Sequence, residues 1–130
     1  MVPEVPPRGT ETILLAEDEE ALRTTMKQAL EGLGYKVLTG PDPMAVFELA
    51  ERHPDPIHLL VTDVVMPGLN AKELQERLSR LKPGIKILFM SGYTAEIIAK
   101  RGLVAKQTHF LQKPFRILDL ARKVREALDE

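Results

Sequence analysis

From residue 12 onward, short apolar runs alternate with stretches in which apolar residues recur every three or four positions. Each run has the length of one buried strand, and each recurring stretch has the pattern of a helix with one face against a core. The five runs cover residues 12–16, 35–39, 57–63, 85–90 and 108–112. This alternation indicates βαβ units, so we predict an α/β fold with a five-stranded parallel sheet between helices.

The recurring stretches also predict which helix residues face the core. They are Leu22, Met26, Ala29, Leu30 and Leu33; Val46, Leu49 and Ala50; Leu74, Leu78 and Leu81; Ile97 and Ile98; and Ile117, Leu120, Ala121, Val124 and Leu128. Asp42 is placed to cap the second helix, with Pro43 in its first turn. Thr94 is predicted to cap a short fourth helix, and the last helix is predicted to begin at Pro114. Lys36 interrupts the second run, which we therefore place at a sheet edge.

Composition and charge narrow the class of protein. The chain has 130 residues, 44% of them hydrophobic, which suits one domain with a buried core. Residues 1–11 contain several prolines and lack apolar periodicity, so we predict a flexible linker there and one domain over 12–130. The net charge of -1 argues against direct nucleic-acid binding. No apolar run approaches the roughly 20 residues of a membrane span, and no signal-peptide pattern is present, so we expect a cytoplasmic domain without membrane contact.

The polar residues at the ends of the predicted strands form the candidate site. Glu17 and Asp18 follow the first strand, and Asp63 ends the third. Ser91 follows the fourth strand, and Lys113 follows the fifth. The carboxyl ends of parallel strands lie along one edge of a sheet, where α/β proteins bind their ligands. We therefore predict that three carboxylates, one hydroxyl and one ammonium group converge at this edge.

These groups suit phosphoryl chemistry. Three neighbouring carboxylates repel one another unless a cation lies between them. Oxygen ligands favour Mg²⁺ over a softer metal, and the chain contains no cysteine. Lys113 and Ser91 are suited to holding the oxygens of a phosphoryl group, and Asp63 can be the nucleophile that forms an acyl phosphate.

Each of these groups has a simpler explanation when it is taken alone. Glu17 and Asp18 could only favour the N-terminus of the following helix, and Asp63 could be a turn former. Ser91 could belong to an ordinary loop, and Lys113 could be a solvated lysine. The simpler explanations leave unexplained why four loops at the same sheet edge all carry suitable groups, so we favour a phosphoacceptor site.

Four segments of the chain, taken together, resemble the receiver domain of response regulators in two-component signalling. They are LLAEDE at 14–19, VTDVVMPG at 61–68, FMSGY at 89–93 and FLQKPF at 110–115. The resemblance covers about residues 12–129. It implies a flavodoxin-like (βα)5 three-layer sandwich whose parallel sheet has the strand order 2-1-3-4-5.

The resemblance also implies a role for individual residues. Asp63 matches the phosphoacceptor, and Lys113 matches the lysine that contacts the phosphate. Glu17, Asp18 and Asp63, with the backbone carbonyl of Val65, match the ligands of Mg²⁺.

A second set of residues matches the family's switch. Ser91 stands at the position of the switch hydroxyl, and Phe110 stands at the position of the switch aromatic residue. The resemblance implies that phosphorylation draws Ser91 inward while Phe110 rotates, which changes the surface of the fourth helix, fifth strand and fifth helix. A homodimer could form through this same surface. The Lys113-Pro114 bond is expected to be cis.

Three features depart from the family pattern. Glu17 is longer than the more frequent aspartate, which favours an indirect metal contact. Phe110 lacks the hydroxyl group of the tyrosine that many relatives carry. Val65 and Tyr93 stand at positions that are often polar in relatives, and we hypothesise that they hinder the attacking water and lengthen the lifetime of the phosphoryl group. Unchanged dephosphorylation of Val65→Asn would contradict this hypothesis.

The resemblance implies a phosphohistidine on a histidine kinase or histidine phosphotransfer domain as the partner. It also implies a signalling switch rather than a turnover enzyme. The proline-containing lead and the SGYT loop resemble the entry and loop of a C-terminal receiver in a hybrid sensor histidine kinase. A stand-alone receiver and the receiver of a DNA-binding regulator are the alternatives.

Other classes of function remain as competitors. A pseudo-receiver would use the same surface for interaction without phosphorylation. A Mg²⁺-dependent phosphatase with an aspartate nucleophile usually has a second carboxylate two residues later, where this chain has Val65. A flavodoxin-like cofactor binder is disfavoured because the acidic residues would repel a cofactor phosphate.

Overall fold

The computed structural model describes residues 5–63, 71–94, 97 and 109–130. Its elements are β1 (Thr12–Ala16), α1 (Glu20–Gly32), β2 (Lys36–Gly40), α2 (Pro43–Arg52), β3 (Leu59–Asp63), α3 (Ala71–Leu81), β4 (Lys86–Ser91), β5 (His109–Gln112) and α5 (Ile117–Asp129). Val65, the side chain of Leu74 and nearly all of the helix predicted from Thr94 lie outside the described residues. Among the described helices, none has the length and apolar character that crossing a membrane requires.

The five strands form one parallel sheet in the order β2-β1-β3-β4-β5, as the resemblance implied. β1 lies between β2 and β3, with Leu14 opposite Leu38 on one side and Leu60 on the other. All residues of β1 are buried, which explains why its sequence is an apolar run instead of an alternating pattern. β2 is an edge strand, as the position of Lys36 predicted.

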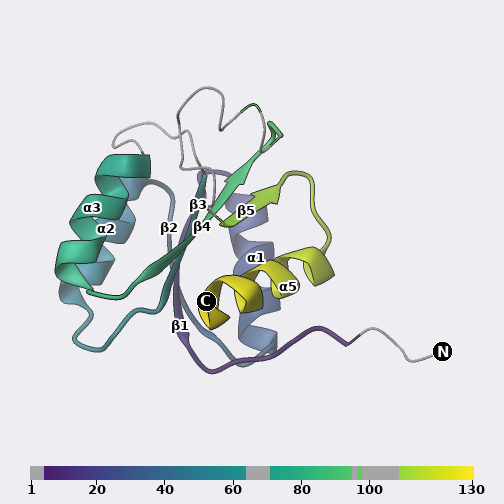
Figure 1. Cartoon of the computed structure of the whole chain (residues 1–130), viewed down its shortest axis with the longest axis horizontal. Helices are drawn as coiled ribbons and strands as arrows, with labels where there is room; N and C mark the ends of the chain where they lie inside the picture. Colours follow the sequence, from purple (N-terminus) through teal and green to yellow (C-terminus); the bar gives the residue numbers. More distant parts are fainter. Residues whose placement is uncertain (1–4, 64–70, 95–96, 98–108) are drawn as a thin grey trace.

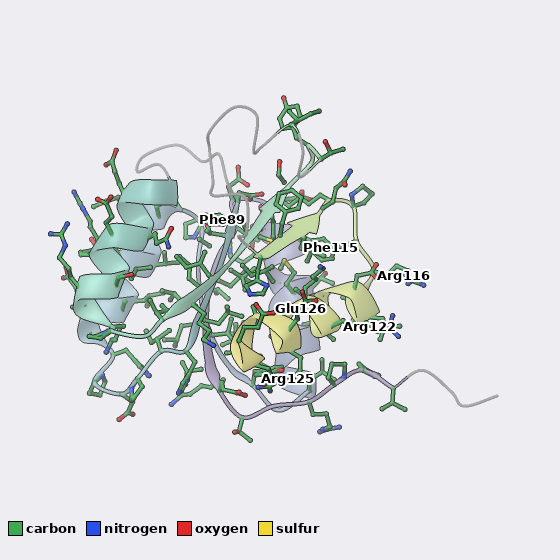
Figure 2. All side chains as sticks on the ribbon, viewed as in Figure 1. Phe89, Phe115, Arg116, Arg122, Arg125 and Glu126 are labelled. Carbon is green, nitrogen blue, oxygen red and sulfur yellow. The ribbon has the colours of Figure 1, made fainter. Side chains whose placement is uncertain are left out.

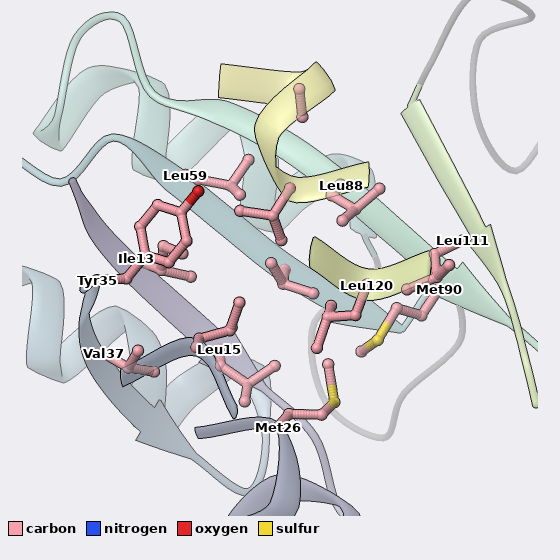
Figure 3. Close-up of a cluster of buried hydrophobic side chains, with 14 residues drawn as sticks. Ile13, Leu15, Met26, Tyr35, Val37, Leu59, Leu88, Met90, Leu111 and Leu120 are labelled. Atoms are coloured by element: carbon pink, nitrogen blue, oxygen red, sulfur yellow. The ribbon is translucent and has the colours of Figure 1, made fainter. Parts of the chain in front are cut away.

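Helices cover both faces of this sheet. α1 and α5 lie on one face, and α2 and α3 lie on the other (Figure 1). Successive β1 residues point to opposite faces, so Ile13 and Leu15 join the core under α1 and α5 while Leu14 joins the core under α2 and α3. Figure 3 shows the first of these cores, in which Met26 of α1 and Leu120 of α5 pack among the strand residues.

The start of α2 follows the predicted capping pattern. The side chain of Asp42 accepts a hydrogen bond of 2.8 Å from the amide of Ala45, and Pro43 is the first helical residue. Val46 and Ala50 are buried, as their spacing predicted. Local signals were therefore sufficient for this helix.

The predicted start of the last helix was wrong. α5 begins at Ile117 and not at Pro114, because Phe115 first packs against the core and Arg116 then caps the helix. The carboxylate of Asp119 accepts a hydrogen bond of 3.1 Å from the Arg116 amide, which is the half of a capping box that the third helical residue supplies. Ile117 was predicted to face the core but is 41% exposed in the first turn.

Part of the predicted linker packs against the domain. The structure describes residues 5–11 of this stretch, and Val5 is 76% exposed. Further along, the amide of Gly9 donates a hydrogen bond of 3.1 Å to the carbonyl of Leu33, and the amide of Lys36 donates one of 3.1 Å to the carbonyl of Glu11. The contacts of the domain therefore begin before the boundary that the sequence predicted near residue 12.

Candidate functional site

The strand ends bring the predicted site residues to the same edge of the sheet. Asp63 is the last residue of β3 and Ser91 the last residue of β4, on neighbouring strands. The amide of Lys113, directly after β5, donates a hydrogen bond of 2.7 Å to the carbonyl of Ser91. Glu17 and Asp18 follow β1, which borders β3 on its other side. The predicted convergence is confirmed for these five residues.

The ammonium group of Lys113 lies between two carboxylates. Its Nζ is 2.6 Å from Oε1 of Glu17 and 2.9 Å from Oδ1 of Asp63. The side chains of Glu17, Asp63 and Lys113 are 1%, 13% and 23% exposed, so the first carboxylate depends on the lysine for its counter-charge while the other two groups reach solvent. The peptide bond between Lys113 and Pro114 is cis, as the resemblance implied.

Glu17 is held at several points besides Lys113. Its amide donates a hydrogen bond of 3.1 Å to the carbonyl of Gly40 on β2. Its carbonyl accepts one of 2.8 Å from Nη1 of Arg23, and its carboxylate Oε2 accepts one of 3.0 Å from the Glu19 amide. The turn between β1 and α1 is therefore fixed at the backbone and at the side chain of the same residue.

Burial and hydrogen bonding shift the pKa values of these groups in different directions. Burial raises the pKa of Glu17, although its hydrogen bond to Lys113 opposes the shift. A hydrogen bond with Glu17 lowers the pKa of the more exposed Asp18. Burial disfavours the ammonium form of Lys113, but hydrogen bonds to Glu17 and Asp63 outweigh burial and raise its pKa. Lys113 therefore stays charged at neutral pH.

The three carboxylates form a set that could hold a metal ion. Glu17, Asp18 and Asp63 each offer one oxygen, and these oxygens lie within 4.8 Å of one another. One lysine cannot balance three carboxylates, and an oxygen-only set of ligands fits Mg²⁺ in charge and in donor type. The remaining predicted ligand, the carbonyl of Val65, lies outside the described residues.

The predicted switch residues lie on the neighbouring strands β4 and β5. Ser91 is 8% exposed, and its Oγ accepts a hydrogen bond of 3.0 Å from the amide of Tyr93. Phe110 is partly buried against the core under α2 and α3, opposite Phe89 in the register of the sheet. Tyr93 is 52% exposed. Ser91 and Phe110 thus belong to the two strands, β4 and β5, that lie on one side of the Asp63 strand β3.

Arg23 was missed by sequence reasoning. It lies outside the set of core-facing residues predicted for the first helix, yet its guanidinium group binds the carbonyl of Glu17. It also lines a surface hollow of about 410 Å³ along α1, together with Lys27. No sequence pattern identifies this contact, because a helix-surface arginine usually extends into solvent.

The chain is similar to known proteins over most of its length. Residues 13–125 match the family model described as the response regulator receiver domain. The sensor kinase CckA of Brucella abortus is 34% identical over 122 residues, which are 94% of this chain but 13% of CckA. The response regulator receiver protein CpdR of Brucella abortus is 33% identical over 116 residues, which are 89% of this chain and 95% of CpdR.

The fold has a counterpart among solved structures. The crystal structure of the receiver domain from the hybrid histidine kinase CckA superposes with a TM-score of 0.74 at 32% sequence identity. The match covers 90% of this chain and 98% of that domain. The chain therefore spans one domain of CckA and a small part of the whole kinase.

Proposed function

The chain belongs to the response regulator receiver domain family, and from this premise we propose that it is a phosphoacceptor switch in which Asp63 accepts a phosphoryl group from a phosphohistidine. The observation that carries the proposal is the position of Asp63, whose carboxylate ends a central strand 2.9 Å from the ammonium of Lys113. A carboxylate that is partly exposed, and placed beside both a cation and further carboxylates, suits nucleophilic attack on phosphorus.

Each residue of the site has a part in the proposed transfer. Glu17, Asp18, Asp63 and the carbonyl of Val65 would hold Mg²⁺, which when bound supplies positive charge to the phosphoryl oxygens. An oxygen of Asp63 attacks the phosphorus atom, the O–P bond forms, and the P–N bond to the donor imidazole breaks with its electron pair left on nitrogen. Lys113 neutralises the charge on the transferred group.

The proposed conformational switch involves Ser91 and Phe110, on the neighbouring strands β4 and β5. In the proposed phosphorylated state, the hydroxyl of Ser91 turns toward the phosphoryl group, and Phe110 moves into the space beside it. This would change the surface of β5 and α5, where we place a partner or a second copy of the domain. Val65 and Tyr93 are proposed to slow hydrolysis by restricting the attacking water. The domain itself is proposed to act as a switch and not as a turnover enzyme.

The context of the domain is a separate proposal. We infer a receiver of a hybrid histidine kinase, which the likeness to CckA supports. The likeness to CpdR, of which the chain covers 95%, supports a stand-alone receiver as the alternative. In either context the phosphohistidine would belong to a histidine kinase or a histidine phosphotransfer domain.

A pseudo-receiver that only binds partners is the second candidate function. Such a domain needs the fold and its surface, but it does not need Lys113 held between Glu17 and Asp63. A Mg²⁺-dependent phosphatase is less well supported, because position 65 offers a valine where a second carboxylate is usual.

One experiment separates these candidates. The protein is incubated with Mg²⁺ and acetyl phosphate, and its intact mass is then measured. We expect the mass to increase by one phosphoryl group, with no increase for Asp63→Asn. Asp55→Asn is the matched control, because Asp55 is an exposed loop aspartate. An unchanged mass of the wild-type protein would favour the pseudo-receiver, and release of phosphate over many turnovers would favour the phosphatase.

A further inference from the structure

A single arginine of α5 binds the chain that enters the domain. Residues 8–11, here called the entry strap, run past Arg125, which Figure 2 labels beside the entering chain. The two Nη atoms of Arg125 contact both carboxylate oxygens of Glu11, with Nη1 at 3.1 Å from Oε1. Nη1 also donates to the carbonyl of Arg8 at 3.2 Å and to the hydroxyl of Tyr35 at 3.3 Å, while Nε is 3.1 Å from Asp129. The guanidinium group thus joins the entry strap, the residue before β2 and the end of α5.

The backbone of the entry strap is also fitted closely to the domain. Gly9 donates to the carbonyl of Leu33, and Glu11 accepts from the amide of Lys36. A Cβ atom on Gly34, which has a φ of +105°, would lie 2.3 Å from the carbonyl oxygen of Gly9. A Cβ atom on Gly9 would lie 2.3 Å from Cε1 of Tyr35. A side chain at Gly34 would therefore have to displace the backbone of the strap, whereas one at Gly9 would have to displace the side chains of Tyr35, Arg125 and Glu11.

α5 connects the entry strap to the proposed phosphoacceptor site. The helix begins at Ile117, a few residues after Lys113, whose ammonium contacts Asp63. Arg125 lies in the later turns of the same helix, and Leu120 and Val124 between them are fully buried in the core. A helix anchored along its length moves largely as one body, so its two ends are mechanically linked.

We propose that the face formed by the end of α1, the start of β2 and α5 is a docking surface for the entering chain, and that its occupation by the entry strap sets the position of α5. The linkage is reciprocal. A partner or preceding domain that pulls the strap away shifts α5, and a displacement of α5 loosens the strap. The proposal does not require phosphorylation of Asp63, so the two proposals can fail separately.

The test is hydrogen exchange of the full chain, followed amide by amide. In Arg125→Gln, we expect the amides of Gly9 and Lys36 to exchange about tenfold faster or more, because the strap loses its side-chain anchor. Arg125→Lys keeps the charge but loses the forked geometry, so its exchange rates at these amides should lie between those of the wild type and Arg125→Gln. Lys123→Gln, on the same helix at 41% exposure, is the matched control and should leave these amides unchanged. Unchanged exchange of Gly9 and Lys36 in both Arg125 variants would overturn the docking surface.

The linkage is tested from the other side with Gly34→Val, which displaces the strap because the Cβ atom would meet only backbone atoms of Gly9 and no atom of α5. We expect faster exchange in the last turns of α5, around Arg125, while the amides of Leu14 and Leu60 in the central strands keep their protection. If the strap is released and α5 exchanges as in the wild type, the linkage is wrong. Gly34→Ala, with a smaller side chain, replaces Gly34→Val if the central strands lose protection.

Discussion

Each end of the sheet carries a cation between carboxylates, but the two clusters are built differently. At the carboxyl ends of the strands, Lys113 lies between Glu17 and Asp63. At the opposite end, Arg125 lies between Glu11 and Asp129 and also binds a tyrosine hydroxyl and a carbonyl. A lysine offers a compact charge on a flexible stem, whereas the arginine fork fixes geometry through several hydrogen bonds at once.

The pKa values of the two glutamates show the consequence. The bidentate hydrogen bond from Arg125 lowers the pKa of Glu11 to about 2. Burial raises the pKa of Glu17, even though Lys113 donates to it at 2.6 Å. Glu11 is thus matched by its cation, while the carboxylates around Lys113 exceed the charge that one lysine can balance. The Arg125 cluster suits a permanent contact, and the Lys113 cluster suits a site that takes up another cation.

The largest expected effect is on the Lys113 cluster, where the carboxylates outnumber the cation. Replacing Lys113 by Met, of similar length, leaves the buried Glu17 without its cation, which should lower the free energy of unfolding by about 3 kcal/mol without metal. Mg²⁺ should restore part of this stability by supplying positive charge. Phosphorylation of Asp63 should slow by about 100-fold, because Lys113 no longer neutralises the transferred group. Urea unfolding with and without Mg²⁺ measures the first effect, and intact mass over time the second.

Lys123→Met is the control for this variant, because it removes an equivalent charge from the surface of α5. It should change neither the unfolding free energy nor the phosphorylation rate appreciably. If Lys113→Met lost the same stability at every Mg²⁺ concentration, the excess of negative charge around Lys113 would not be what the metal relieves.

The opposite cluster can be tested through a matched pair of glycines. Gly34 and Gly84 both have positive φ, at 105° and 85°, but only Gly34 faces a nearby atom, the carbonyl oxygen of Gly9. Gly84→Ala should cost about 1 kcal/mol of unfolding free energy from backbone strain alone. Gly34→Ala should cost about 2 kcal/mol, since it adds displacement of the entry strap. Equal losses in urea unfolding would mean that the strap contributes no stability through this contact.

The ion pair of Glu11 predicts a dependence on pH. Because the pKa of Glu11 in the folded protein, about 2, lies below its ordinary value of 4.5, its contribution is fully present above pH 4.5 and is lost as the pH falls toward 2. At pH 7 we expect the free energy of unfolding of the wild type to exceed that of Glu11→Gln by about 1 kcal/mol, a figure that allows for the partial exposure of the Glu11 side chain. Urea unfolding of both proteins between pH 7 and pH 3 measures the difference, which should shrink on acidification. A difference that does not change with pH would show that the pair is not the source of the stability.

Sequence patterns were sufficient for one end of the sheet and not for the other. The apolar runs predicted the strands, and strand ends in a parallel sheet must meet, so Glu17, Asp63 and Lys113 could be brought together from their positions alone. Their strand order came from the resemblance, since alternation leaves it open. The entry strap has no periodicity, and its contacts depend on Arg125, which is distant in sequence and looks like any helix-surface arginine.

The start of α5 illustrates the same limit at short range. Pro114 has the local properties of a first helical residue, but packing of Phe115 on the core delays the helix until Ile117. Asp42 and Pro43 fulfilled the same kind of prediction, because the capping hydrogen bond of that helix is made within its own first turn. Local signals therefore predict an element well where its contacts are local, and less well where a neighbouring residue is drawn to the core.

The smallest expected effect concerns Arg23, which lies beside the Lys113 cluster but resembles Arg125, because its guanidinium group holds a backbone carbonyl. Its guanidinium holds the carbonyl of Glu17 at 2.8 Å, next to two of the proposed Mg²⁺ ligands. Arg23→Gln should weaken Mg²⁺ binding by about fivefold, less than the loss typical of groups that contact a ligand side chain, because the contact is to backbone. The free energy of unfolding without Mg²⁺ should change little, since β1 and β2 still hold the turn.

Lys27→Gln, one turn further along the same hollow, is the control and should bind Mg²⁺ like the wild type in calorimetric titration. Equal Mg²⁺ affinity in all three proteins would show that Arg23 does not support the metal ligands. Equal weakening in both variants would show that the charge of α1, and not the hydrogen bond to Glu17, affects Mg²⁺ binding.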